Sequence, residues 1–366
     1  MRGTLQRIDA DVIQVCRAYH VEKQALVTYD PFSVEQRMLT TVSITSEMEA
    51  LLRAVDAQHI RLVLDAFDGI DWGNLTETQL EARLARIAAI LPDRSAMSAG
   101  VADLSAYLKR EGREVFEATK GGFSNRYNIS LEASFNLQDE RALANIVDQQ
   151  AFFVRNSYGL RSEWMSSRAR TMVQQGLAEG LSSSAIAQEM RVAIPGSYEA
   201  RMRGYYDVVS HHFVARAQER GALSLYMDAG VTRVRLVAVQ DERTTEWCRS
   251  HDGAIIDVRR EAAKQNRIDQ LANPEDVRYE SPWISERLER DAGGIPTGRS
   301  VMGAFKAPGQ FVPLRYVERP GAGTLSPGRY SPVPGVGQDK IESIGIGFPP
   351  YHGRCRSWTE LETSRL

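Results

Sequence analysis

The sequence predicts a mainly α-helical protein of the α+β class, and three features of its pattern support that class. Apolar residues recur three or four positions apart over long stretches between residues 9 and 227, which is the period of amphipathic helices. Strict alternation of apolar and polar residues is confined to short segments. Nine of the fourteen prolines fall between Pro296 and Pro350. We therefore expect helices first, then a small β-sheet or hairpin, then a long Pro/Gly-rich insertion.

The first region, residues 1–125, is expected to be helical throughout. Helical spacing covers 9–26, 33–55 and 76–91 and then continues to about residue 118. Thr76 and Gln79 form a capping-box pattern, in which a Thr side chain and a Gln three residues later satisfy the first free backbone N–H groups of a helix. The glycines of "KGGFSN", residues 120–125, are expected to break the chain here.

The second region, residues 126–258, is expected to be a helical core that leads into a small sheet. Alternation over 129–137 predicts one strand, and helices resume over 139–170. A turn, a short helix capped by one of the serines at 182–184, and a long helix over 197–227 should follow. After Gly230 the pattern predicts a strand over 233–239, and the turn dipeptide Asp252-Gly253 predicts a second strand after it.

The last two regions are residues 259–347 and 348–366. The first is expected to begin with a charged, helix-like piece that runs to about residue 291. The Pro/Gly-rich remainder, about 293–347, is expected to be a loop or an extended arm, because such composition disfavours packed secondary structure. The second carries the closing motif "PPYHGRCR", whose prolines, histidine and cysteine are unusual at the end of a chain.

Composition limits the classes of protein that the chain can belong to. With 366 residues, 43% hydrophobic and 25% charged, it is long enough for two or three domains and ordinary for a globular protein. A net charge of −2 provides no global positive field for nucleic acid or anionic lipid. No apolar stretch approaches 18 residues, so no membrane span is expected. Three cysteines make no disulfide framework, and no signal-peptide pattern opens the chain, so we expect folding in a reducing cytoplasm.

Two cysteines and two histidines form a pair of candidate metal-binding motifs. Cys248 and His251 have C-x-x-H spacing, and His352 and Cys355 repeat it as H-x-x-C. Two thiolates and two imidazoles are a complete tetrahedral ligand set for Zn²⁺, and such a clip would close the long insertion between the motifs. Two other interpretations stay open: the cysteines are small buried packing residues, or they form a disulfide. A cysteine nucleophile is disfavoured, because no glycine-rich nucleophile turn or oxyanion-hole sequence accompanies it.

Charged residues beside these motifs suggest a second link. Asp241 follows a predicted strand directly, where its carboxylate can accept backbone N–H bonds of the next turn. Arg243 or Arg356 could pair in a bidentate manner with Asp241 or Asp252 and tie the two motifs together. A phosphate contact is the alternative, but no other phosphate-binding signal accompanies these residues, so we favour the structural tie.

The order of these elements resembles the phage Mu F-like head morphogenesis family, the minor capsid proteins of tailed phages. The resemblance covers roughly residues 139–362 and includes the helix, Ala215–Val231, that leads into the first motif. The matching residues are Asp241, Arg243, Thr244, Cys248, Asp252, Gly253, Pro349, Pro350, His352, Cys355 and Arg356. Family members often carry a second cysteine just before the Cys248 position and often end Cys-Arg-Cys. This chain has Thr244-Thr245 and Ser357 there.

The resemblance implies a structural protein rather than an enzyme. The expected role is that of a minor capsid protein of a tailed phage or prophage-like particle, in head assembly and in DNA packaging or delivery. The expected partners are the portal protein and/or the major capsid protein, with few copies per particle. The implied location is the virion, in the head interior or near the portal, after assembly in the host cytoplasm. The helical region 1–125 is the candidate docking region.

Two further functional hypotheses follow from the sequence. Arginines on the expected helices could make a weak contact with packaged DNA, although a solvated helix face is the simpler interpretation. These arginines are Arg155, Arg161, Arg168, Arg170, Arg191, Arg201 and Arg203. The alternative to a structural protein is a phage-associated toxin or enzyme, either a Cys/His hydrolase or an ADP-ribosyltransferase-like effector. Such an effector would have to lie in the first 130 residues or so, whose pattern is that of plain amphipathic helices.

Overall fold

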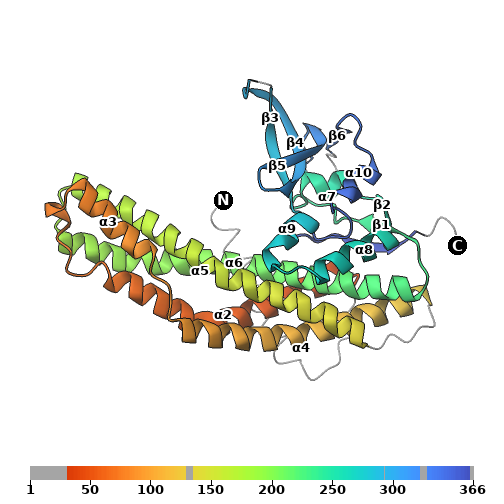
Figure 1. Ribbon diagram of the computed structural model, residues 1–366, viewed down its shortest axis with the longest axis horizontal. Coiled ribbons are helices and arrows are strands. Elements are labelled where there is room, and N and C mark those ends of the chain that lie inside the picture. The colour runs from red at the N-terminus through yellow and green to blue at the C-terminus, as the bar shows by residue number, and fades with distance from the viewer. Residues whose placement is uncertain (1–30, 129–134, 292, 322–327, 363–366) are drawn as a thin grey trace. The chain divides into compact units, whose positions relative to one another are not determined.

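A computed structural model describes residues 31–128, 135–291, 293–321 and 328–362 (Figure 1). The described residues are mainly helical and include two small antiparallel sheets, so the predicted fold class is confirmed. The chain forms two compact units, each made of segments that are far apart in the sequence. The first unit comprises the described parts of Met1–Ser43, Arg110–Ile146 and Ser210–Leu366, and the second comprises Ile44–Lys109 and Val147–Val209.

Long helices account for most of the described chain. They are α2 (Val34–Asp65), α4 (Arg94–Tyr127), α5 (Leu137–Ala178) and α6 (Ser183–Asp228). A shorter helix, α3 (Glu77–Ala88), follows the one-turn 3₁₀ helix η1 (Trp72–Asn74) and begins with the predicted capping box of Thr76 and Gln79. Among the described residues, no helix combines the length and the apolarity that crossing a bilayer requires.

Two predicted interruptions of the helices are wrong. Helix α4 continues through "KGGFSN". Gly122 faces Pro31 so closely that a Cβ at this position would lie 2.6 Å from the proline ring, so this glycine serves packing rather than a turn. Helix α6 is continuous from Ser183 and contains Pro195, where we expected two separate helices. The predicted strand at 129–137 lies mostly outside the described residues, and Leu137 at its end begins α5.

The helical second unit contains a polar cluster in its interior. The Asp56 carboxylate accepts hydrogen bonds from the hydroxyls of Tyr158 and Tyr198 at 3.0 Å and of Tyr206 at 2.8 Å. Arg161 donates to the same carboxylate at 3.0 Å, and only 3% of its side chain is exposed. Burying this arginine requires a paired anion and stacked rings, which the aspartate and the tyrosines provide.

The first unit contains a three-stranded antiparallel sheet with the strand order β2-β1-β7. Strands β1 (Arg233–Val237) and β2 (Ile255–Asp257) are the two predicted strands, and β1 also pairs with β7 (Trp358–Leu361). Val234 and Leu236 of β1 are fully buried in the core of this unit. Because β7 follows the closing motif, its pairing with β1 returns the end of the chain to the first motif.

The Pro/Gly-rich stretch is not a loop, contrary to the prediction. It forms most of a four-stranded antiparallel sheet in sequence order, and α10 (Gln338–Ser343) follows. The strands are β3 (Ile284–Arg290), β4 (Pro296–Ala307), β5 (Gln310–Arg319) and β6 (Arg329–Pro332). Pro296 begins a strand, Pro313 lies at a register shift, and Pro332 ends the edge strand β6, so these prolines occupy positions where a missing N–H is tolerated.

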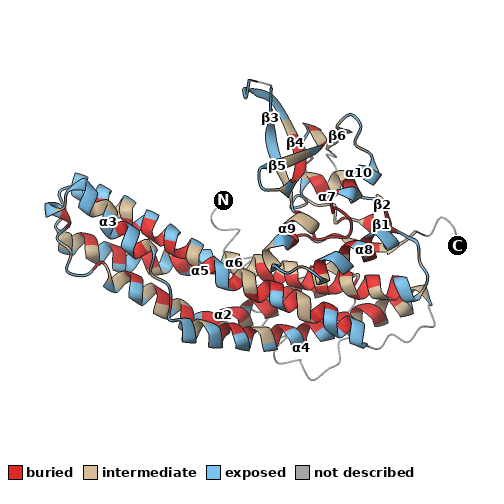
Figure 2. Ribbon diagram, viewed as in Figure 1, coloured by how far each residue is buried: buried red, intermediate tan, exposed pale blue. Residues whose placement is uncertain are grey.

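The charged piece before this sheet is shorter than predicted. Helix α8 (Val258–Asp269) begins where the Asp257 side chain accepts the backbone N–H groups of Arg259 and Arg260. Two short elements follow, η2 (Pro274–Asp276) and α9 (Val277–Glu280), and the chain is already in β3 at Ile284 rather than helical to residue 291. Figure 2 shows that α7 (Glu246–His251) consists of buried and half-buried residues, whereas much of the outer part of β3 is exposed.

Candidate functional site

The first half of the site is the short helix α7. Its N-cap is Thr245, whose hydroxyl accepts the backbone N–H of Cys248 at 3.5 Å. The predicted turn follows: Gly253 adopts φ +78°, a left-handed conformation that favours glycine. The Asp252 carboxylate accepts the backbone N–H of Ala238 at 2.8 Å. Cys248 is thereby fixed between β1 and β2, with 2% of its surface exposed.

The second half of the site is the closing loop before β7. The Pro349–Pro350 peptide bond is cis, and Tyr351 after it is buried. The backbone N–H of Cys355 donates to the carbonyl of His352 at 3.2 Å, which folds the loop into a turn. This turn directs His352 and Cys355 toward α7, as their distances to Cys248 show.

Cys248, His352 and Cys355 come together in one cluster, in which all three ligand atoms lie within 4.8 Å of one another. The Cys248 Sγ lies 3.5 Å from His352 Nε2 and 3.9 Å from Cys355 Sγ. Zinc bonds of about 2.3 Å to sulfur and 2.0 Å to nitrogen at tetrahedral angles require S–S and S–N separations of about 3.8 and 3.5 Å. The donor set and its spacing therefore fit three corners of a tetrahedral metal site. The two cysteines are free thiols, so they do not form the disulfide considered above.

Electrostatics favours a thiolate in this cluster. Burial opposes ionisation of Cys355, but hydrogen bonds from Cys248 and His352 hold its pKa well below the ordinary value. The hydrogen bond to Cys355, together with burial, raises the pKa of Cys248. Of the two sulfurs, Cys355 is thus the one whose surroundings favour the thiolate, the form that binds metals.

His251 is not part of the cluster, contrary to the prediction. Its ring is fully buried and stacks on Trp247 with the ring centroids 4.8 Å apart. Its Nδ1 lies 3.5 Å from the guanidinium of Arg315, a residue of β5. Burial, together with this cation, lowers the pKa of His251 to about 3, so the ring is neutral. His251 therefore anchors the four-stranded sheet to α7, a role that C-x-x-H spacing does not reveal.

The predicted tie between the two motifs is formed by Asp241 and Arg356. The guanidinium of Arg356 donates to both carboxylate oxygens, at 2.7 Å to Oδ2. The Asp241 carboxylate also accepts the hydroxyl of Thr244 and the backbone N–H of Arg243, each at 3.0 Å. The hydrogen bonds from Arg356 are the main reason why the pKa of Asp241 lies well below its usual range. The side chain of Arg243 does not form this ion pair.

Several residues that support the closing loop were not predicted. Arg37 of α2 donates to the carbonyl of Arg356 at 3.0 Å and lies over the ring of Trp358. Glu219 of α6 accepts the hydroxyl of Thr359 at 2.8 Å, and it is buried. In the sequence these two residues look like ordinary charged positions of amphipathic helices, so only the fold reveals their role.

Ser357 occupies an informative position beside the cluster. Only 3% of the residue is exposed, and its side chain counteracts in part the raised pKa of the Cys248 thiol, so the two side chains are neighbours.

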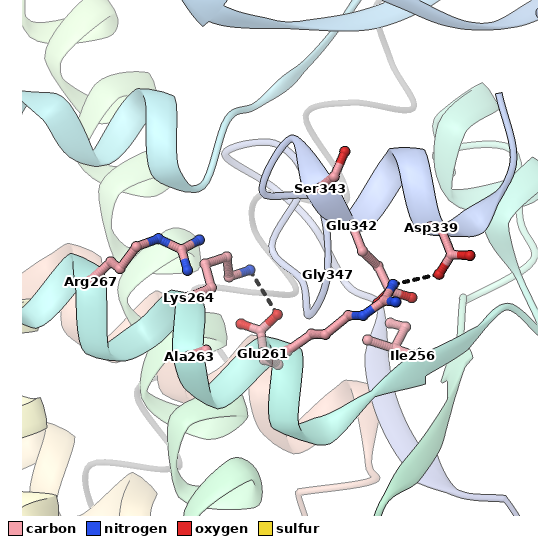
Figure 3. A pocket seen from close by; sticks show the side chains of 10 residues that line it. Ile256, Glu261, Ala263, Lys264, Arg267, Asp339, Glu342, Ser343 and Gly347 are labelled. Carbon is pink, nitrogen blue, oxygen red and sulfur yellow. Dashed lines mark hydrogen bonds and ion pairs between the residues drawn. The ribbon is translucent and has the colours of Figure 1, made fainter. Parts of the chain in front are cut away.

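A cavity of about 480 Å³ lies beside α8 and α10, separate from the cysteine cluster (Figure 3). Its charged side chains pair with one another: Lys264 donates to Glu261 at 2.8 Å, and Arg260 donates to Asp339. The Glu261 carboxylate also accepts the backbone N–H of Phe348, just before the closing motif. Lys264 and Glu261 are thereby tied to each other and, through Glu261, to the backbone that leads into the closing motif.

The fold and the cluster define an α+β protein with a mainly helical scaffold and a Cys/His/Cys cluster that could hold a metal ion. Comparisons of the chain with protein-family models, with curated proteins and with solved structures each find no match. The resemblance to the Mu F-like family therefore rests on the motif residues and their order.

Proposed function

We propose that the chain is a structural protein of a tailed-phage or prophage-like head, a minor capsid protein that binds the portal or the inner capsid surface. The observation that carries this proposal is the meeting of the two motifs on which the resemblance rests. They are about a hundred residues apart in the sequence, yet they share the Cys248 cluster and the Asp241–Arg356 ion pair. A shared motif that serves to close a scaffold supports a structural role.

Within this proposal, the cluster binds a structural Zn²⁺ ion through Cys248, His352 and Cys355. The ion would supply ligand bonds that hold the closing loop on α7, and its binding free energy would add to the free energy of unfolding. The burial of both thiols supports a structural site, because a catalytic zinc ion needs an open position that substrate can reach.

Metal analysis of the purified chain tests the zinc site. We expect about one Zn²⁺ ion per chain. Cys355→Ser or His352→Ala should each weaken the zinc affinity at least tenfold, since each removes one of three ligands. The matched control is Cys16→Ser, which removes the third cysteine of the chain, a residue outside both motifs, and should leave the metal content unchanged. A full zinc content in the Cys355→Ser variant would contradict the site.

The structural role is tested by cosedimentation with assembled particles. The purified chain, mixed with portal rings or empty capsid shells of the parent phage, should pellet with one of them at a few copies per particle. A variant with a changed α2–α4 surface that still folds would map the docking region. A chain that stays in the supernatant with both kinds of particle would contradict the proposal, whatever its zinc content.

A Cys/His hydrolase is the second candidate, because Cys248 Sγ and His352 Nε2 lie within 3.5 Å of each other. The burial of both cysteines disfavours it, since a nucleophile must reach its substrate. We expect no turnover of activated ester or amide substrates by the purified chain. Turnover that is abolished by Cys248→Ser but unaffected by His251→Gln would favour the hydrolase over the structural protein.

A further inference from the structure

The four-stranded sheet has two faces of different character. Met302 and Ala304 of β4 and Val317 of β5 belong to the buried core of the first unit, so one face of the sheet is covered. Residues on a strand alternate between faces, and cross-strand partners share a face. Arg287, Val301 and Tyr316 are such partners across β3, β4 and β5, and they lie on the opposite face.

This second face carries arginines stacked on aromatic rings. The Arg287 guanidinium carbon lies 4.5 Å from the ring centroid of Phe305 and 5.2 Å from that of Phe311. These two phenylalanines are cross-strand partners with ring centroids 5.5 Å apart. The guanidinium carbon of Arg299 lies 4.4 Å from the ring centroid of Tyr316. Both arginines are exposed, and the three rings are half-buried, so these planar groups reach solvent.

The segment that forms this sheet is more positive than the chain as a whole. Residues 284–332 contain seven arginines and lysines and four aspartates and glutamates, whereas the net charge of the chain is −2. Two glutamates of this sheet are engaged by neighbouring side chains. Glu289 accepts the hydroxyl of Thr297 at 3.0 Å, and Glu318 pairs with Arg329 at 2.9 Å. The charge of this face therefore complements an anionic ligand.

Three of the helical arginines are less suited to such a ligand. Arg161 is buried against Asp56. Arg170 and Arg191 pair with carboxylates of the same unit, Glu81 and Asp68 respectively. Their charges are thus partly neutralised within the helical unit, and no aromatic platform accompanies these two ion pairs.

We propose that the arginine-aromatic face, defined by Arg287, Arg299, Phe305, Phe311 and Tyr316, binds single-stranded nucleic acid. Aromatic rings and guanidinium planes are stacking surfaces for unpaired bases, and the guanidinium edges donate to phosphate oxygens. A duplex keeps its base faces stacked within the helix and exposes only base edges and phosphates, neither of which stacks on a ring. Stacking therefore selects a single strand.

Fluorescence anisotropy of the full chain with a labelled oligothymidine of about 20 nucleotides tests this proposal. We expect saturable binding that is stronger than binding to a duplex of the same length. With two phosphate contacts, affinity should fall about sevenfold between about 50 and 200 mM salt. Replacing both Arg287 and Arg299 by alanine should weaken binding at least tenfold, in line with the loss of about one or two stacked bases.

The matched control is Lys306→Ala, because Lys306 is an exposed cation of the same sheet and, within the part of the chain that the structure describes, stacks on no aromatic ring. It should change the affinity by less than about twofold. A second variant, Arg287→Lys with Arg299→Lys, keeps the charge and the three rings but loses the two guanidinium planes. It should retain the salt dependence but weaken the preference for oligothymidine over an abasic strand of equal length.

Three results would overturn the proposal. They are the absence of oligothymidine binding at about 100 μM protein, equal affinity for duplex and single strand, and unchanged binding by the double lysine variant with its base preference intact. The lysine variant also decides the case in which the alanine variant does not fold, since both of its side chains remain long, positive and exposed.

Discussion

Removing the guanidinium of Arg356 should destabilise the chain by breaking the tie between the two motifs. In the structure this group donates to both oxygens of Asp241, and the exposed fractions of the two side chains are 14% and 34%. A hydrogen bond to a charged group contributes about 1.5–3 kcal/mol when it is well shielded, and a fully exposed ion pair contributes about 0.2–1 kcal/mol. Because water reaches part of this pair, we expect a coupling free energy of about 1.5 kcal/mol.

The pH dependence of this coupling has a definite sign. The pKa of Asp241 lies well below its usual range, chiefly because of the hydrogen bonds from Arg356. The unfolded chain therefore takes up this proton first as the pH falls below about 4, the ordinary pKa of an aspartate. The stabilisation should be complete above about pH 5 and should decline as the pH falls from there toward the lowered pKa.

A double-mutant cycle with Arg356→Ala and Asp241→Ala, followed by urea unfolding, measures the coupling. The matched cycle uses Arg243→Ala, since the side chain of Arg243 does not pair with Asp241, and it should give a coupling below about 0.5 kcal/mol. A coupling free energy between Arg356 and Asp241 below about 0.5 kcal/mol at pH 7 would contradict this tie, and so would an equal coupling free energy at about pH 3 and pH 7.

Three further predictions address other parts of the chain. Asp56→Ala leaves Arg161 buried without its anion and should lower the free energy of unfolding by about 3 kcal/mol, measured in urea; a loss below about 1 kcal/mol would contradict this. Burial raises the pKa of Glu219 to about 8, so the unfolded chain releases this proton first and stability should fall as the pH rises from about 4.5 to 8. In urea unfolding at about pH 4.5 and pH 8, Glu219→Gln should reduce this pH-dependent loss of unfolding free energy by at least about 1 kcal/mol. A loss equal to that of the unaltered chain would contradict the role of Glu219. Ser357→Cys adds a sulfur beside Cys248 and should raise the zinc affinity at least tenfold, measured by competition with a chelator. An affinity equal to that of the unaltered chain would contradict a position of residue 357 within reach of the ion.

Long periodic segments were predictable, and their interruptions were not. The helices around 33–55 and 76–91 follow from apolar spacing and from the capping box at Thr76. Gly122 reads as a break in the sequence, but it is a position of close contact with Pro31, a residue about ninety positions away. Local propensity does not contain that contact.

The Pro/Gly-rich segment shows the same limit. Composition suggests a loop, because proline cannot donate to a β-ladder and glycine weakens a strand. In the structure Gly309 makes the turn between β4 and β5 with φ +73°, and Gly303 lies where a Cβ would come within 2.2 Å of the carbonyl of Val312. These residues mark the turns and the register shifts of a sheet, and a count of residues does not distinguish those positions from a loop.

For the candidate site, the two motifs predicted more than half of the cluster. The C-x-x-H and H-x-x-C spacings predicted that Cys248, His352 and Cys355 would meet, and the structure brings these three together. An ion pair was expected between Asp241 or Asp252 and Arg243 or Arg356, and it is formed by Asp241 and Arg356. The C-x-x-H spacing wrongly added His251. Its surroundings are set by Arg315, which comes from a strand about sixty residues later in the sequence.

Helix α7 connects the clustered motifs to the inserted sheet, and this explains why an insertion of such length is compatible with an ordered closing loop. Cys248 faces the closing loop, whereas His251 and Glu246 face the sheet through Arg315 and Tyr330. Closing a loop costs conformational entropy that grows only slowly with its length, so contacts at both ends of one short helix can offset it. If the cluster binds zinc, the ion stabilises α7 from one side while the sheet stabilises it from the other. The closing loop and the sheet are then coupled through α7, because both contact this one short helix.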